Sequence, residues 1–218
     1  MDAVVCVLLG YFIGTVNPAY IISKIKGFDI RSRGSGNAGA TNAFLTIGKD
    51  WGLLCALLDI FKGFVAFRLA KYIFPNLTYA GMLCGASCIM GHIFPVWLGF
   101  QGGKGLACVA GTVLAFHWKV FLVLLVFEIA LALAVDYICV MAMSLALIVP
   151  VVYGWMTRDI IGTLALVAVG LVLEYKHMDN IHRIREGSEL HLSYLWNKEA
   201  EIARVTEALG EDRTDELV

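Results

Sequence analysis

Apolar residues are grouped along the chain into seven blocks, which short polar segments separate. The blocks cover residues 3–23, 51–74, 78–98, 106–116, 119–135, 137–156 and 159–174. A helix needs roughly 20 apolar residues to cross a hydrocarbon core of about 30 Å. A backbone in lipid must also satisfy its polar groups within helices or a closed barrel. The pattern therefore predicts an all-α integral membrane protein with about seven transmembrane helices, some of them short.

Two segments depart from this simple pattern of spans. Residues 106–116 rise only about 16 Å as a helix, so we expect either a re-entrant segment or a helix in a thinned part of the bilayer. Residues 190–209 have the pattern of a polar amphipathic helix, and the chain is expected to fray at 210–212. These boundaries divide the chain into a membrane-embedded domain, residues 1–190, and a C-terminal tail, residues 191–218.

Composition excludes the other large classes of protein. Hydrophobic residues make up 59% of the chain and charged residues 16%, and the mean hydropathy is +0.76. A soluble domain is about 45–50% apolar with about 25% charge, and a soluble fold of this size could not bury so much apolar surface. Charge this low also excludes intrinsic disorder.

Charge is distributed unevenly although the net charge is only -1. Residues 186–218 hold nine acidic and three basic residues, so the tail is predicted to be an acidic, solvated segment. The basic membrane body indicates anionic ligands or lipid headgroups, or simply a solvated basic rim. Basic residues gather near 24–49, 104 and 176–185, whereas the opposite side carries Lys119 and Arg158. The positive-inside rule then places the N-terminus outside and the C-terminus in the cytoplasm.

The six cysteines all lie in apolar stretches, and none forms a C-x-x-C pair. Cys84 and Cys88 share a helix face, but no histidine or carboxylate completes a metal set there. We expect the cysteines to be small packing residues, with no disulfide framework and no metal.

Three polar, glycine-containing segments fall on the predicted inner side: residues 29–50, 91–108 and 176–189, called here the first, second and third polar segments. In the first, Gly34, Gly36 and Gly39 fit G-x-G-x-x-G, but no strand precedes them as a dinucleotide site requires. A glycine-rich backbone can still curl and aim its N–H groups at an anion. The alternative is a tight surface turn. The segment also supplies side-chain donors from Ser35, Asn37, Thr41 and Asn42.

The second polar segment places Lys104 among three glycines directly before an apolar helix. A lysine at a helix N-terminus suits phosphate. The segment is not a P-loop, because Gly105 stands where a serine or threonine would bind magnesium. A lysine that snorkels to the membrane surface is the alternative. The glycines are Gly102, Gly103 and Gly105.

The third polar segment carries His177 and Asn180, which share one helix face at this spacing. Arg183 and Arg185 in the same segment could simply be positive-inside residues. Within the second apolar block, Asp59 and Lys62 are three residues apart. They could form a structural ion pair, contact substrate or line an ion path. The isolated Glu128 has no assigned role.

These motifs resemble a known family. Residues 34–42 (GSGNAGATN), 91–107 (GHIFPVWLGFQGGKGLA), 177–189 (HMDNIHRIREGSE) and the D-x-x-K-G at 59–63 resemble the PlsY-type acyl-phosphate:glycerol-3-phosphate acyltransferases. The resemblance implies a bacterial inner-membrane enzyme of phospholipid synthesis. It would move an acyl chain from acyl-phosphate to glycerol 3-phosphate, giving 1-acyl-glycerol 3-phosphate and phosphate. It also implies contact with membrane lipids, and neither a cofactor nor a metal nor a nucleic-acid partner. The oligomeric state stays open.

The resemblance also implies site residues, which agree with the polar segments above. The expected catalytic residues are Lys104, His177, Asn180 and Ser35. The expected substrate-binding residues are Gly34, Gly36, Asn37, Thr41, Asn42, Gly102, Gly103, Gly105, His92 and Glu189.

Acyl-phosphate is a mixed anhydride with a good leaving group, so we expect direct attack by the glycerol hydroxyl. Lys104 and the amides of Gly102, Gly103 and Gly105 would hold a phosphate. His177 is the candidate general base, and a phosphate oxygen of the substrate is the alternative. This hypothesis requires Ser35, Lys104 and His177 to lie close together.

One position departs from the family pattern. Family members generally carry arginine where this chain has Leu45. Losing a charge-assisted hydrogen bond costs about 1.5–3 kcal/mol, so phosphate binding is expected to suffer unless Arg31 or Arg33 substitutes. A divergent paralogue with altered or no activity is therefore one alternative function. A membrane transporter of small phosphorylated anions is another, although it would need charged groups lining a path from both sides.

Overall fold

The computed structural model describes residues 1–209, and every regular element among them is a helix or a 3-10 turn, as the sequence predicts. The predicted C-terminal fraying lies outside the described residues. The helices are α1 (Asp2–Thr15), α2 (Pro18–Ile25), α3 (Ala40–Thr46), α4 (Lys49–Ile73), α5 (Ala80–Ile93), α6 (Leu106–Phe116), α7 (Trp118–Val135), α8 (Cys139–Thr157), α9 (Ile160–Lys176), α10 (Met178–Glu186) and α11 (Lys198–Leu209). The 3-10 turns are η1 (Ile30–Ser32), η2 (Val96–Leu98) and η3 (Leu192–Leu195).

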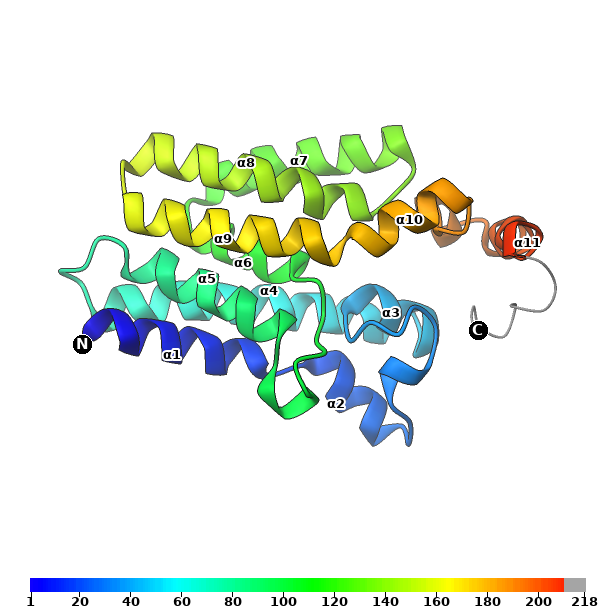
Figure 1. Ribbon diagram of the computed structural model, residues 1–218, viewed down its shortest axis with the longest axis horizontal. Helices are drawn as coiled ribbons and strands as arrows, with labels where there is room; N and C mark the ends of the chain where they lie inside the picture. Colours follow the sequence, from blue (N-terminus) through cyan, green and yellow to red (C-terminus); the bar gives the residue numbers. More distant parts are fainter. Residues whose placement is uncertain (210–218) are drawn as a thin grey trace.

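The long helices run side by side in one bundle, in which α7, α8 and α9 lie on one side and α1 and α4 on the other (Figure 1). Helix α5 is central, since it contacts α1, α4, α6 and α9. Close packing there depends on small residues: a Cβ at Gly10 would lie 2.1 Å from the carbonyl oxygen of Cys84, and one at Gly14 only 2.0 Å from that of Cys88. Small residues bring helices together in the same way in lipid. All six cysteines are free and buried, which confirms their packing role.

Within residues 1–209, five candidate spans are long and apolar enough to cross a membrane, and α6 is the shorter apolar helix that the sequence predicts. Helix α4 is also long, at 25 residues, but it contains Asp59 and Lys62. These helices together account for the seven predicted blocks. Both carboxyl oxygens of Glu128 of α7, unassigned from the sequence, lie within hydrogen-bond distance of the Ser144 hydroxyl of α8, at 2.6 and 2.7 Å. Glu128 therefore joins two helices within the apolar bundle.

One predicted span contains a break, and one predicted helix start is wrong. The first block, predicted as one span over residues 3–23, agrees with the candidate span Asp2–Ile25, but its helix breaks at Val16, whose backbone is extended. Asn17 then caps α2, because its side chain accepts the Tyr20 amide and Pro18 follows it, and a proline disfavours helix in the residue before it. The predicted amphipathic helix over 190–209 begins only at Lys198, since η3 and an extended His191 precede it.

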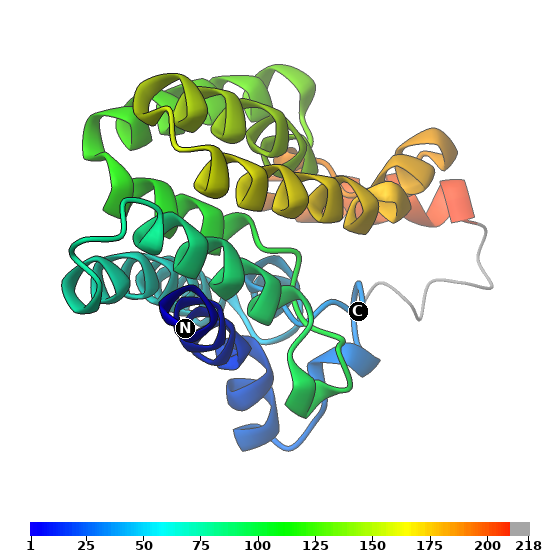
Figure 2. The ribbon, with the colours of Figure 1, turned by 60° about the vertical axis from the view of Figure 1, so that its left-hand side comes forward.

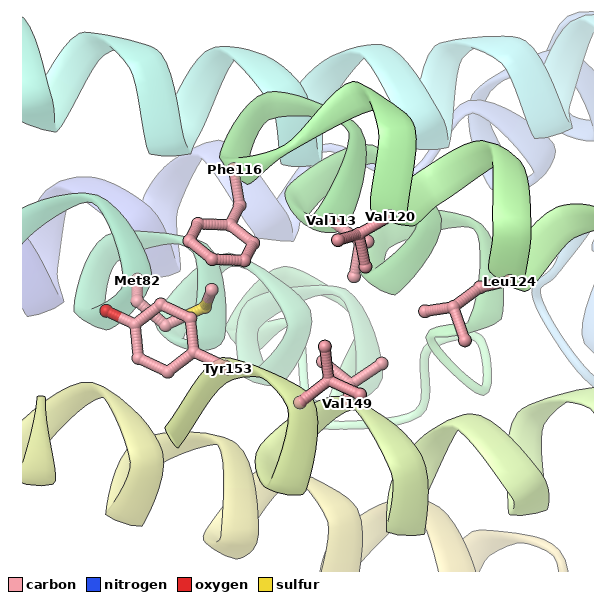
Figure 3. A pocket seen from close by; sticks show the side chains of 8 residues that line it. Met82, Val113, Phe116, Val120, Leu124, Val149 and Tyr153 are labelled. Carbon is pink, nitrogen blue, oxygen red and sulfur yellow. The ribbon is translucent and has the colours of Figure 1, made fainter. Parts of the chain in front are cut away.

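The two ends of the bundle differ in character. The turns α4–α5, α6–α7 and α8–α9 lie at one end, while the three polar segments, α10 and α11 lie at the other (Figures 1 and 2). Toward the turn end, α5, α6, α7 and α8 enclose an apolar pocket in which the rings of Phe116 and Tyr153 meet edge to face, 5.0 Å apart (Figure 3). All polar chemistry considered below therefore concentrates at one end, as the sequence predicts.

Candidate active site

The first polar segment is held in shape by Asn42, which is fully buried. The Asn42 amide nitrogen donates to the carbonyl oxygens of Ile30 and Arg33, both at 3.0 Å, and its oxygen accepts the Ser35 amide at 3.0 Å. Gly34 has a φ of +57°, and a Cβ there would collide with the Asn42 oxygen at 2.3 Å. The Asn42 side chain thus fixes the loop through three hydrogen bonds to its backbone. The loop in turn carries the exposed Ser35 side chain.

The second polar segment is fastened to the end of α5. The amides of Gly102 and Gly103 donate to the carbonyl oxygens of Ile93 and His92, both at 3.1 Å. Both amides thus bond to carbonyls that the end of helix α5 leaves without partners in the helix, and the expected contact of Gly102 and Gly103 with a phosphate stays a prediction. A Cβ at Gly103 would lie 2.1 Å from Nε2 of His92, so only glycine fits there.

Gly105 ends this loop with a φ of +94° and caps the N-terminus of α6. The first amides of a helix lack partners within the helix, and the N-terminus carries partial positive charge. Lys104 immediately precedes this cap, so ammonium and helix dipole reinforce each other. The positive potential that the sequence predicts thus comes from Lys104 and the start of α6 rather than from Gly102 and Gly103.

Lys104 also joins the second polar segment to the third. Its ammonium donates to the side-chain oxygen of Asn180. The Asn180 amide nitrogen donates to Glu189 at 2.6 Å, and Arg183 donates to the other Glu189 oxygen at 2.6 Å. These four residues, Lys104, Asn180, Arg183 and Glu189, are called here the loop cluster. Arg183, which the sequence left open as a positive-inside residue, is part of it.

Electrostatics at Lys104 are unusual for a lysine. Burial lowers its pKa to about 8, and the nearby Arg183 charge acts in the same direction, against the opposing effect of Glu189. An amine that titrates near neutral pH is typical of functional sites. Lys104 is still mostly protonated at pH 7.

His177 lies at the junction of α9 and α10 and is buried. Its Nδ1 lies 2.7 Å from the carbonyl oxygen of Leu173. Because a carbonyl can only accept, Nδ1 carries the proton, and the lone pair of the neutral ring is on Nε2. This is the tautomer that a general base requires.

The first and second polar segments also touch. The carbonyl oxygen of Ala38 would lie 3.1 Å from a Cβ at Gly103, and the Cα of Gly103 would lie 3.8 Å from a Cβ at Gly39. The buried Asn17 donates to Ala38 at 2.8 Å while it caps α2. No sequence motif pointed to Asn17, because its partner Ala38 lies in the first polar segment, 21 residues away along the chain.

All three polar segments therefore meet around the second, through Gly103 on one side and Lys104 on the other. Lys104 and Asn180 are in direct contact, while the proximity of Ser35, Lys104 and His177 that the site hypothesis requires stays a prediction. The side chains of Ser35, Asn37 and Thr41 belong to the same end of the molecule, and their approach to substrate stays a prediction.

Beneath these segments lies a second group, Asp59, Lys62 and His92, called here the inner cluster. Lys62 pairs with Asp59 at 2.8 Å, which agrees with the first of the three alternatives that the sequence left open, and lies 2.8 Å from Nδ1 of His92. Lys62 also donates to the carbonyl oxygens of Gly14 at 3.0 Å and Val16 at 2.7 Å, where α1 ends. The inner cluster thus fixes the α1–α2 break against α4 and α5.

Asp59, His92 and Cys108 lie close enough to one another to hold a metal ion. The Lys62 ammonium already stands among them and supplies the positive charge that balances Asp59. The donor set therefore fits an ion-pair network better than a metal centre.

Comparison with known proteins identifies the family. A family model described as glycerol-3-phosphate acyltransferase matches residues 4–187. The chain belongs to the glycerol-3-phosphate acyltransferase family. The enzyme of that name from Staphylococcus saprophyticus is 35% identical over 203 residues, covering 89% of this chain and 100% of that protein. The one from Rhodopseudomonas palustris is 36% identical over 187 residues, covering 85% and 92%.

Solved structures agree with this assignment to the acyltransferase family. The crystal structure of PlsY, an integral membrane glycerol 3-phosphate acyltransferase, in its glycerol 3-phosphate form matches with a TM-score of 0.81 and 29% identity, covering 89% of this chain and 98% of that chain. The lysophosphatidic acid form matches with a TM-score of 0.76 at the same identity. The predicted multi-pass, all-helical membrane fold is thereby confirmed.

Arg31 and Arg33, the possible substitutes for the family arginine at the position of Leu45, differ in their contacts. Arg31 pairs with Asp29 at 2.9 Å and donates to the carbonyl oxygen of Leu98 at 2.8 Å. This pairing holds the pKa of the Asp29 carboxyl well below its usual range. Arg33 is exposed and lies over the Phe28 ring, 4.2 Å from its centroid. Of the two arginines that the sequence offers as substitutes for the family arginine, Arg33 is thus the less committed.

Proposed function

We propose that this protein transfers an acyl chain from acyl-phosphate to glycerol 3-phosphate, releasing 1-acyl-glycerol 3-phosphate and phosphate. Membership of the acyltransferase family supports glycerol 3-phosphate as the acceptor. The contact between Lys104 and Asn180 is the observation that supports the location of the active site. That contact joins two motifs that are distant in sequence at one polar end of a membrane bundle. We further propose a bacterial inner membrane, with an outside N-terminus and the polar end in the cytoplasm, because the basic residues gather there.

Both substrates carry phosphate, so the site needs positive charge more than it needs a nucleophile. Lys104 and the N-terminus of α6 hold one phosphate and stabilise charge that develops on it as the anhydride breaks. Asn180 and Ser35 orient the acceptor, so that its hydroxyl lies close to the acyl carbon. The acyl chain itself lies in the bilayer, against the apolar helices that continue from this end.

His177 accepts the proton of the attacking hydroxyl at Nε2. The Leu173 carbonyl holds the ring in the required tautomer, so no rearrangement precedes the transfer. Bond formation between the hydroxyl oxygen and the acyl carbon then expels phosphate, and no covalent enzyme intermediate is needed. Glu189 acts indirectly, because its carboxylate aligns Asn180 and Arg183.

The test uses purified protein in detergent with synthetic acyl-phosphate and labelled glycerol 3-phosphate. Labelled lipid that depends on both substrates is the expected result. A parallel assay with protein in sealed vesicles measures uptake of the label. Uptake without lipid formation would show that the protein is a transporter. If neither uptake nor lipid formation is observed, the protein is an inactive paralogue. Acyl-coenzyme A in place of acyl-phosphate tests the donor, and equal activity with it would contradict the proposed donor.

A further inference from the structure

Residues 191–209, which follow the third polar segment, pack against the loop of Gly187 and Glu189 and against the α7–α8 turn. The family model ends at residue 187, so these residues lie beyond it. The sequence predicts a solvated acidic tail, yet Glu201 is only 6% exposed and Val205 is fully buried. Figures 1 and 2 place α11 beyond α10 at the polar end.

Arg204 of α11 bonds directly to the backbone that presents Glu189. Its guanidinium donates to the carbonyl oxygen of Gly187 at 2.5 Å and to that of Glu189 at 2.6 Å. One planar guanidinium thus bonds two carbonyls of the same loop and holds them in a fixed geometry. The position of the Glu189 backbone is set from outside the family motif.

Glu201 secures Arg204 and also the start of the tail. It pairs with Arg204 at 3.0 Å and accepts the His191 amide at 3.1 Å. Burial raises the pKa of Glu201, but the hydrogen bonds from Arg204 and His191 outweigh it, so its pKa lies below the ordinary value and it is ionised at neutral pH. An ionised, buried carboxylate needs these partners.

The start of the tail is also tied to the membrane bundle. The amides of Leu192 and Ser193 donate to the backbone and side-chain oxygens of Asp136 in the α7–α8 turn, at 2.7 and 3.0 Å. Nε2 of His191 lies 3.1 Å from the Tyr137 hydroxyl in the same turn. The tail therefore bridges a fixed turn of the bundle and the loop of Glu189.

We propose that Arg204 and Glu201 are positioning residues that hold Glu189 in register with Asn180 and Lys104. They touch no reacting group in this proposal, which rests on the proposed function. Their effect passes along one chain of contacts, from Arg204 to the Glu189 backbone, then through the Glu189 carboxylate to Asn180 and on to Lys104.

The test compares full-length wild type, Arg204→Gln and Arg204→Lys, with Glu207→Gln as a control at an exposed acid of the same helix. We expect Arg204→Gln to raise the KM for glycerol 3-phosphate about 10- to 100-fold, as small misplacements of a positioned group do. Arg204→Lys should restore part of it, and Glu207→Gln should change nothing. A kcat and KM equal to wild type in Arg204→Gln would overturn the proposal.

A pH profile separates positioning from simple loss of folded protein. The charge of Glu189 raises the pKa of Lys104. If Glu189 moves away, that pKa falls further below 8, and the alkaline limb of the activity profile shifts to lower pH in Arg204→Gln. Lower activity with an unshifted limb and a lower melting temperature would instead show general destabilisation and overturn the proposal. The other titratable groups acting on Lys104 or on His177 beside it are Arg183, Asp179 and Cys139.

Hydrogen exchange provides a measurement that does not depend on turnover. We expect faster exchange across residues 178–190 in Arg204→Gln than in wild type or Glu207→Gln. If wild type makes no lipid but this exchange difference is present, the proposed function fails and the tail contact stands. If wild type is active and exchange is unchanged in Arg204→Gln, the positioning proposal fails alone.

Discussion

The inner cluster and the loop cluster are both built around a lysine and a carboxylate, but they differ in what the lysine contacts. Lys62 is buried and surrounded by Asp59, His92 and two backbone carbonyls. Lys104 is half-buried and donates to the neutral amide of Asn180. The carboxylate of the loop cluster, Glu189, is bonded to Asn180 and not to Lys104 itself. A lysine whose charge is fully matched holds structure together, whereas a lysine that is left short of negative charge attracts an anion.

The largest effect is expected from removing the unmatched charge. Lys104→Ala should abolish turnover while the protein stays folded. Loss of a single neutral donor to a developing oxyanion costs about 10²–10³ in rate, and a full charge contributes more. Lys26→Ala, at an exposed lysine of the same end, is the control. Turnover retained by Lys104→Ala would contradict the role assigned to the loop cluster.

The lysine of the loop cluster should also set the alkaline limit of activity. Because the pKa of Lys104 is about 8, the ammonium is lost as the pH rises through 8, more than two units before an ordinary lysine. Activity should therefore fall above pH 8. In Lys104→Arg the guanidinium stays charged, so whatever activity this variant keeps should not decline over that range. A wild-type rate that stays constant to pH 10 would contradict the low pKa.

The next effect is expected at His177, the proposed general base at the junction of α9 and α10. His177→Gln should lower kcat about 100-fold or more, the usual contribution of a positioned general base. His182→Gln is the matched control, since that ring is exposed on the same helix. A loss of only a few-fold would favour a phosphate oxygen of the substrate as the proton acceptor and leave His177 a structural role.

The inner cluster should respond in stability instead. Lys62→Met leaves Asp59 and the carbonyls of Gly14 and Val16 without their cation, and breaking a buried pair costs about 3–5 kcal/mol. Thermal unfolding in detergent should show a melting temperature lower by roughly 10 °C. Lys49→Met, at the exposed start of the same helix, should show little change. A Lys62→Met protein that is as stable as wild type but inactive would show that Lys62 takes part in the reaction. The two clusters would then not differ in function as described here.

The same contrast shows what could be predicted from sequence. Pairing of Asp59 with Lys62 follows from a spacing of three residues on a helix, and the meeting of three polar segments follows from counting spans between them. The bonds from Lys62 to Gly14 and Val16 could not be predicted, because they depend on where α1 breaks. The bonds from the amides of Gly102 and Gly103 to the carbonyl end of α5 could not be predicted for a related reason, because packing brings these groups together.

The smallest effect is expected from adding a positive charge to the polar end of the bundle, at Leu45, rather than removing one. Leu45 lies half-buried in α3, beside the loop that presents Ser35. Leu45→Arg should restore the family residue and lower the KM for glycerol 3-phosphate by about tenfold, since one charge-assisted hydrogen bond is worth about 1.5–3 kcal/mol. Leu45→Met is the neutral control. An unchanged KM would mean that another arginine already supplies this charge. In that case Arg33→Gln should raise the KM, whereas Arg31→Gln should mainly destabilise the loop, because Arg31 is already bonded to Asp29 and Leu98.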